Sequence, residues 1–172
     1  MKTSIVLTVI ADDHPGIINM VSEVLYKHGG AWTESSMASL AGQFAGILLA
    51  SVNSESAQAC VEELQGLESK GLHVIAQLGG TPHAASATRE YMLDLVGNDR
   101  RGIVHDITAI LARHNVNVQQ LETVVEGVPM AGGEVFKATA RLLVSQDTDI
   151  DALEGELEAI ANELMVKITL EQ

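Results

Sequence analysis

Apolar residues along this 172-residue chain follow two periods, and each period predicts a different kind of element. Residues 4–10 and 90–96 alternate or run apolar, which is typical of β-strands. After each run, apolar residues recur every three or four positions, which is typical of an amphipathic helix. The positions that share the helix face are Ile17, Val21, Val24, Leu25 and His28, and then Ile103, Ile107, Ile110, Leu111 and His114.

Both predicted helices are followed by the same further elements. Gly29–Gly30 end the first helix, and His114–Asn115 end the second. The later elements are strands over 31–40 and 117–126, alternating strands over 44–52 and 136–144, helices carrying Ala57, Val61, Leu64 and Leu67 or Ile150, Leu153, Leu157, Ile160 and Leu164, and last strands over 73–78 and 166–170. Ser54 and Asp149 are the predicted N-caps of the later helices.

The chain is an internal repeat. With an offset of 86 residues, "IVLTVIADDHPGIINMVSEVLYKHGGAW" aligns without a gap with "YMLDLVGNDRRGIVHDITAILARHNVNV". After about six extra residues in the second copy, "FAGILLASV" aligns with "FKATARLLV". The stretch "GGTPHAASA" between the copies has the composition of a linker. We therefore predict domains over 1–79 and 89–172, joined by a linker over 80–88.

The order βαββαβ, present twice, predicts an α+β protein made of two tandem ferredoxin-like domains. Each domain would be an antiparallel four-stranded sheet with two helices on one face. A domain of about eighty residues has a thin core, so an uncovered sheet face or edge favours pairing with another domain. We therefore expect pairing between the copies or a homo-oligomer.

The composition narrows the function further. The net charge is −13, and both copies are acidic. An acidic surface repels phosphate backbones, and the few aromatic residues offer little to stack on bases, so no direct nucleic-acid binding is expected.

Cys60 is the single cysteine, which excludes an internal disulfide, and a buried, inert thiol is the expectation. The first apolar run is too short for a membrane span and unlike a signal peptide, so we expect a cytoplasmic protein without membrane contact.

Two stretches between the first strand and the first helix of each copy carry the candidate chemistry. In "DDHPGI", Pro15 fits the first helical turn, Asp13 can cap the helix, and Gly16 permits close approach of backbone or ligand. The free N–H groups of the helix start favour a carboxylate, and Asp12, Asp13 and His14 favour an amine, so the stretch suits a zwitterionic amino acid. A plain cap and turn is the alternative.

The second stretch, "NDRRGI", keeps Asp99 and Gly102 in those roles. Asn98 replaces an acid, and Arg100–Arg101 replace His14 and Pro15. Reacting groups would have to be kept in both copies, whereas a helix-opening loop need only keep its shape. The repeat therefore favours a binding loop over a catalytic cluster.

These stretches resemble the D-R-P-G-I loop of ACT domains, and "HGGAW" and "HNVNV" resemble the turn into that family's second strand. The resemblance covers nearly the whole chain as two tandem copies. It implies a regulatory module that binds an amino acid where the loop faces another domain, and it implies no catalytic residue. The ligand-binding positions that it implies are Asp12, Asp13, His14, Pro15, Gly16, Ile17, Asn98, Asp99, Arg100, Arg101, Gly102, Ile103 and Asn117. Asn115 and Asn117 suit amide contacts or a plain turn equally well.

A free-standing pair of such domains resembles the glycine cleavage system transcriptional repressors. That family's implied role is to restrain a DNA-binding transcriptional activator by protein contact in response to glycine. No cofactor is implied beyond this possible effector. A sensor of another amino acid, or of another regulatory partner, is the alternative.

Two other classes have weaker support. A small ferredoxin-like phosphatase would use Arg100 or Arg101 with Asn115 or Asn117, but the first copy lacks the arginine and no nucleophile stands beside a base. The six histidines fall on separate elements, so no metal site is expected. His28 and His114 are expected to be structural, near the last carbonyls of their helices.

Overall fold

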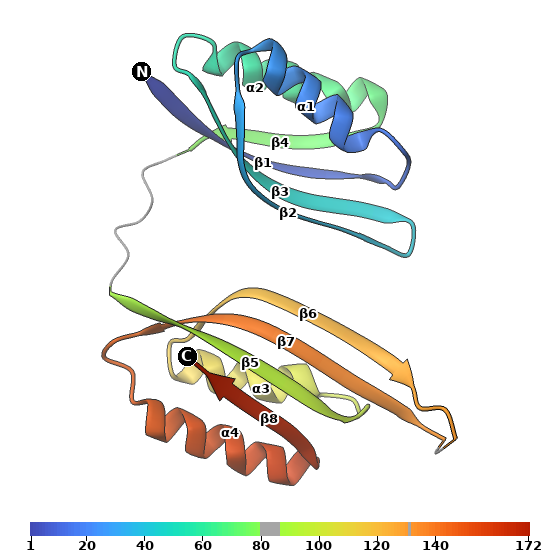
Figure 1. Ribbon diagram of the computed structural model, residues 1–172, viewed down its shortest axis with the longest axis vertical. Helices are drawn as coiled ribbons and strands as arrows, with labels where there is room; N and C mark the ends of the chain where they lie inside the picture. The colour runs from blue at the N-terminus through green and yellow to red at the C-terminus, as the bar shows by residue number, and fades with distance from the viewer. Residues whose placement is uncertain (80–86, 131) are drawn as a thin grey trace. The chain divides into compact units, whose positions relative to one another are not determined.

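The chain folds into two compact units, Met1–Pro82 and His83–Gln172, shown by the computed structural model in Figure 1. The structure describes residues 1–79, 87–130 and 132–172. Most of the predicted linker, 80–88, therefore lies outside the described residues, and its last residue, Thr88, begins a strand. No helix of the described segments is both long enough and apolar enough to cross a membrane.

Both units have the predicted order of elements. Unit 1 contains β1 (Lys2–Asp12), α1 (Ile17–Lys27), β2 (Ala31–Leu40), β3 (Gln43–Asn53), α2 (Ala57–Gln65), the 3-10 helix η1 (Gly66–Lys70) and β4 (His73–Leu78). Unit 2 contains β5 (Thr88–Asn98), α3 (Ile103–Arg113), β6 (Asn117–Gly127), β7 (Glu134–Ser145), α4 (Ile150–Leu164) and β8 (Val166–Glu171). The prediction of βαββαβ, twice, is confirmed.

Each unit has one antiparallel four-stranded sheet, with the strand order β2-β3-β1-β4 in unit 1 and β6-β7-β5-β8 in unit 2. Both helices of a unit lie on the same face of its sheet (Figure 1). The strand register also matches. Thr8 lies between Ile47 and Ile75 in unit 1, and Asp94 lies between Thr139 and Thr169 in unit 2. The α+β, tandem ferredoxin-like fold is confirmed, and the two units can be compared position by position.

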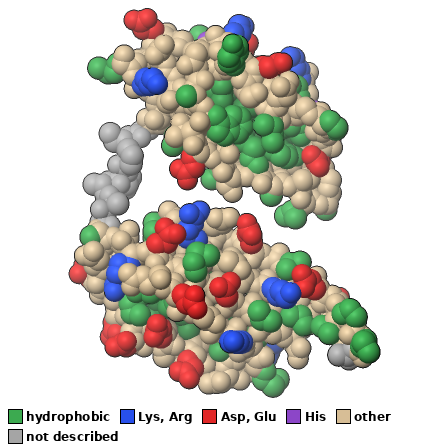
Figure 2. All heavy atoms as spheres, viewed as in Figure 1, with side chains coloured by type: hydrophobic (Ala, Val, Ile, Leu, Met, Phe, Trp, Pro, Cys, Tyr) green, Lys and Arg blue, Asp and Glu red, His purple; other side chains and the backbone are tan. Residues whose placement is uncertain are grey.

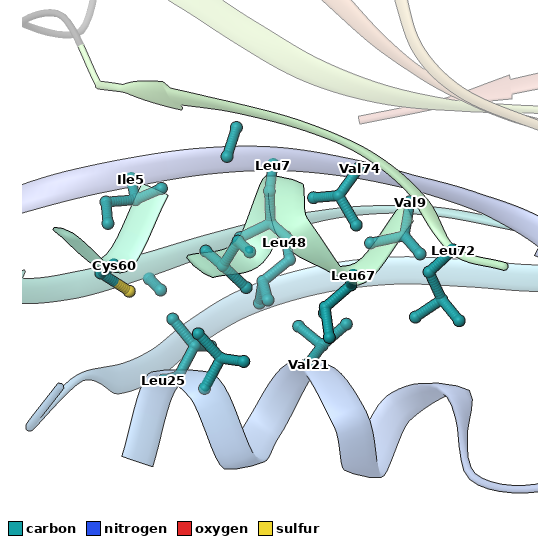
Figure 3. Close-up of a cluster of buried hydrophobic side chains, with 14 of the residues drawn as sticks. Ile5, Leu7, Val9, Val21, Leu25, Leu48, Cys60, Leu67, Leu72 and Val74 are labelled. Atoms are coloured by element: carbon teal, nitrogen blue, oxygen red, sulfur yellow. The ribbon is translucent and has the colours of Figure 1, made fainter. Parts of the chain in front are cut away.

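The core of unit 1 lies between its sheet and its helices. Alternate residues of β1 face the helices and are buried, which the apolar alternation predicts. In Figure 3, Val21 and Leu25 of α1 point toward Leu7 and Leu48 of the sheet. Cys60 of α2 is fully buried, as predicted, and burial, followed by the charge of Glu63, raises the pKa of its thiol.

The helix ends follow the sequence in part. The Asp149 side chain accepts a hydrogen bond from the Ala152 N–H at 3.0 Å, so the predicted N-cap of α4 is confirmed. The predicted cap at Ser54 is wrong, because α2 begins later and its N-cap position is Ser56. The Ser54 hydroxyl instead donates to the Met1 carbonyl oxygen at 3.1 Å. Ser54 lies two residues before the N-cap, and its hydroxyl is used in the hydrogen bond to Met1.

Candidate functional site

Loop 1 (residues 12–17) and loop 2 (residues 98–103) connect the first strand of a unit to its first helix. Each has a glycine at the N-cap in the left-handed region, with φ of 98° at Gly16 and 97° at Gly102. A Cβ added at Gly16 would meet no atom within 4 Å. Backbone conformation, rather than close packing by another backbone, therefore explains this glycine. Ile17 and Ile103 point inward and are buried in their units.

The predicted helix cap by Asp13 is wrong. The helix begins at Ile17, and its N-cap, Gly16, has no side-chain cap. A side chain that caps a helix in this way stands at the N-cap position, and Asp13 lies three residues before it. Pro15 likewise lies in the turn before the N-cap and outside the first helical turn, contrary to expectation.

Loop 1 is instead tied to the hairpin between β2 and β3. The Asp13 carboxylate accepts a hydrogen bond from the Ser39 hydroxyl at 2.6 Å. The backbone N–H of Asp13 donates to the Gly42 carbonyl oxygen at 2.8 Å. The Gln43 side-chain amide donates to the Asp12 carboxylate at 2.7 Å. These contacts orient both carboxylates while leaving them exposed to solvent, and His14 beside them is also exposed.

Loop 2 has the same backbone hydrogen bond to its neighbouring hairpin as loop 1, but its side chains carry different charges. The Asp99 N–H donates to the Glu134 carbonyl oxygen at 2.9 Å, as the Asp13 N–H does in unit 1. Asn98, Asp99, Arg100 and Arg101 are exposed. Two guanidinium groups and one carboxylate therefore stand where loop 1 has two carboxylates and an imidazole.

Both loops present free backbone donors. The first hydrogen bonds inside the helices run from the Met20 N–H to the Gly16 carbonyl oxygen and from the Asp106 N–H to the Gly102 carbonyl oxygen. The N–H groups of residues 17–19 and 103–105 precede these bonds and have no acceptor within their helix. Together with the positive end of the helix dipole they favour an anion such as a carboxylate. The arginines strengthen that preference at loop 2, and the two aspartates oppose it at loop 1.

The structure does not bring the two asparagines to loop 2. Asn115 has φ of 53° in the turn that ends α3, so it takes the predicted turn role. Asn117 is exposed at the start of β6, next to that turn. The 11 residues of α3 span roughly 16 Å between this end and Arg101. Within unit 2, this separation argues against a phosphatase site built from both groups.

A pair of matching ionic clusters was missed from the sequence. In unit 1, the Glu63 carboxylate lies 2.9 Å from Lys27 Nζ and 2.8 Å from His28 Nε2. In unit 2, Glu156 lies 2.6 Å from Arg113 Nη2 and 3.2 Å from His114 Nε2. The histidines are therefore structural, as predicted, but they contact glutamates rather than the last carbonyls. The equal positions of the two glutamates in the repeat were the available clue.

Hydrogen bonding in these clusters shifts two pKa values. Lys27, and then His28, hold the pKa of Glu63 below its usual value. Arg113, and then His114, do the same for Glu156. Each cluster joins the end of the first helix of a unit to its second helix. Among the described residues no group of three His, Cys, Asp or Glu side chains could hold a metal ion.

Unit 2 has an apolar pocket under the first turns of α3. Its lining includes Ile103, Ile107, Leu121, Phe136 and Ala138. In unit 1 the sheet positions that match Thr123 and Ala138 are Met37 and Gly46. Met37 packs on the core there, and a Cβ on Gly46 would overlap its side chain. The two units therefore differ beside their loops: Met37 fills this place in unit 1, and unit 2 leaves it open.

Comparison with known proteins gives three findings. Residues 3–75 match the family model of the ACT domain. The solved structure of an unknown protein from Galdieria sulphuraria is 30% identical, with a TM-score of 0.88, and the match covers 99% of this chain and 98% of that one. A solved structure provisionally named a glycine cleavage system transcriptional repressor is 20% identical, with a TM-score of 0.65, and the match covers 99% and 97% of the two chains. No curated protein matches the chain.

Proposed function

We propose that this chain, whose residues 3–75 match the ACT domain family, is a regulatory protein of that family that binds an amino acid and regulates transcription through contact with another protein. The specific role that we propose is that of a glycine cleavage system transcriptional repressor. Glycine would be the effector, and a DNA-binding transcriptional activator would be the partner. The full-length fold likeness to a structure of that provisional name supports this choice.

The observation that carries the proposal is the repeated loop. Loop 1 and loop 2 each place a left-handed glycine directly before a helix whose first N–H groups have no acceptor within the helix. Each also holds at least one exposed carboxylate, Asp12 and Asp13 in loop 1 and Asp99 in loop 2. Backbone donors suit the carboxylate of an amino acid, and aspartates suit its ammonium group. Both poles of a zwitterion therefore have partners.

The proposed mode of action is protein contact without catalysis. The exposed face of α4 carries Asp151, Glu154 and Glu158, and the whole chain has a net charge of −13. Such a surface repels DNA and attracts a basic protein surface. A protein that restrains a DNA-binding activator needs to attract the activator's surface, and it does not need to bind DNA itself. A cytoplasmic location fits the same role.

Titration calorimetry with a panel of amino acids tests the proposal. We expect glycine to bind more tightly than serine, alanine or leucine, and Gly16→Val or Gly102→Val to abolish the binding at its own loop. Gly71→Val is the matched control, because Gly71 also has a left-handed φ, 87°, with open space around it, and lies outside both loops. Circular dichroism would verify that each variant folds. Glycine binding unchanged by both loop variants would remove the site assignment.

A second candidate effector is an amino acid with an apolar side chain. The specific observation that favours it is the apolar pocket of unit 2, whose lining includes Ile103, the last residue of loop 2, and Val104, which follows it. Glycine has no side chain to fill such a pocket, whereas alanine or leucine has. Tighter binding of alanine or leucine than of glycine in the same panel would support this candidate and reject the glycine-specific role.

A further inference from the structure

The sheet of unit 1 has a face that its helices do not cover, and this open face is apolar. Its centre consists of Val6, Ile10, Ala45, Ile47, Leu49 and Ile75 on β1, β3 and β4, with Thr8 as the one polar residue among them. The exposed fractions are large: 57% for Ile47, 48% for Ile75, 45% for Val6 and 44% for Ile10. Figure 2 shows hydrophobic side chains gathered on unit 1, away from its helices. Exposed aliphatic side chains in one contiguous patch are unusual on a surface that faces only water.

The open face of unit 2 has the same backbone but a more polar surface, on which Met92 and Val96 remain apolar as Val6 and Ile10 are in unit 1. The strand register matches Thr8 with Asp94, Ala45 with Lys137, Ile47 with Thr139, Leu49 with Arg141 and Ile75 with Thr169. The polar side chains also bond one another, since the Thr139 hydroxyl donates to Asp94 at 2.9 Å and Lys137 pairs with Glu126 at 2.6 Å. The fold therefore does not require an apolar open face. Something other than folding explains the aliphatic side chains in unit 1.

We propose that the open face of unit 1 pairs with the same face of a second copy of the chain. The open face of unit 2 is a poor match, because Lys137, Arg141 and Asp94 would lose water against aliphatic side chains that offer them no hydrogen bond. The centre of the unit 1 face has no charged side chain, so a second copy of it supplies matching apolar surface without that cost. An isologous contact of this kind closes on itself and makes a dimer.

The size of the face sets the strength of the contact. Four strands spaced about 4.8 Å apart, each paired over six to eleven residues, make a face that buries on the order of 1,000 Å² when two copies meet. That area lies near the lower limit for a specific interface. The dimer is therefore expected to dissociate on dilution rather than to be permanent.

Sedimentation of the full chain over a wide concentration range tests the proposal. We expect a monomer–dimer equilibrium, and Thr8→Asp should raise its dissociation constant at least ten-fold. Asp94 occupies the matching position of unit 2, so the fold accepts this substitution, and circular dichroism would verify it. The combination Ile47→Thr with Ile75→Thr, which again introduces the residues of unit 2, should weaken the dimer in the same way.

The matched control changes the open face of unit 2. Thr139→Ala with Thr169→Ala should leave the dissociation constant unchanged, because those positions lie outside the proposed contact. Three results would overturn the proposal: a monomer at every concentration, a dimer that Thr8→Asp leaves intact, or equal weakening by the unit 2 control. None of these outcomes depends on amino-acid binding, so the dimer and the proposed effector site are tested separately.

Discussion

Unit 1 and unit 2 share most of their internal contacts and differ mainly at their surfaces. The left-handed N-cap glycines have φ values of 98° and 97°, and the ionic clusters on Glu63 and Glu156 use matching positions. By contrast, Arg100 and Arg101 replace His14 and Pro15 in the loops. The shared features are those that the fold requires. Many of the differences lie on the loops and open faces, where a ligand or a partner could select them. Two others lie inside the units: Met37 fills a place that is a pocket in unit 2, and Ala11 stands where unit 2 has Gly97.

The first prediction tests whether each unit depends on its own core, and it has the largest expected effect. Leu64 of α2 and Leu157 of α4 occupy matching places and are almost fully buried. Leu64→Ala should destabilise unit 1 by about 2–5 kcal/mol, because it removes buried methyl groups and leaves a cavity. Hydrogen exchange resolved by residue should show the loss in unit 1, and Leu157→Ala should show it in unit 2. Equal loss of protection in both units from either variant would contradict separate cores.

The second prediction concerns a glycine that only unit 2 needs. Gly97 lies opposite Val166 in the sheet, and a Cβ on it would come within 3.0 Å of the Val166 Cα atom. In unit 1 the matching position holds Ala11, which is buried, and the pairing of β1 with β4 ends one residue earlier, at Ile10 and His73. Gly97→Ala should therefore cost unit 2 about 1–3 kcal/mol by overpacking, measured by chemical denaturation.

The control for this prediction is a double-mutant cycle. Val166→Ala removes the Cγ atoms that crowd the added Cβ, so the cost of Gly97→Ala should be smaller in that background. Ala11→Gly, the reverse change in unit 1, should relieve no crowding. An unchanged cost in the Val166→Ala background would show that contact with the Val166 side chain is not the cause.

Most of the fold follows from the sequence because its two periods are strong and occur twice. The helical spacing from Ile17 to Leu25 and its repeat from Ile103 to Leu111 correspond to α1 and α3. The contrast between the open faces is also visible in the sequence. "FAGILLASV" is apolar on both faces of the strand, whereas "FKATARLLV" places Lys137, Thr139 and Arg141 on one face.

The sequence pattern could not predict contacts between segments that lie far apart along the chain. The role of Asp13 depends on Ser39 and Gly42, which only the folded hairpin brings to loop 1. Capping propensity alone assigned Asp13 to the helix, and the left-handed turn at Gly16 overrode it. The partner of His28 is Glu63, 35 residues away on another helix. Local patterns specify elements, but they do not specify which exposed side chains meet after packing.

The third prediction sharpens the contrast between the loops. Arg100→Ala with Arg101→Ala removes two positive charges next to the free N–H groups of α3. The affinity of unit 2 for the carboxylate of an amino acid should fall about two- to five-fold, a typical effect for a charge near a helix end. Chemical-shift titration with glycine would follow each unit separately. Lys137→Ala with Lys167→Ala, which removes the same charge from the open face, is the control and should change little.

The fourth prediction has the smallest expected effect and tests whether the ionic clusters are equivalent. Because the pKa of Glu63 and of Glu156 is lowered in the folded protein, each ion pair adds stability above the usual carboxyl pKa of 4.5. That contribution disappears as the pH falls through the lowered pKa. Glu63→Gln and Glu156→Gln should therefore destabilise modestly at pH 7 and progressively less below pH 4.5, measured as the difference in denaturation midpoint from the unmodified chain. Both glutamate side chains are partly exposed to solvent, so added salt should reduce the effect of either substitution. A difference that persisted undiminished at pH 3 would assign the effect to packing of the side chain rather than to its charge.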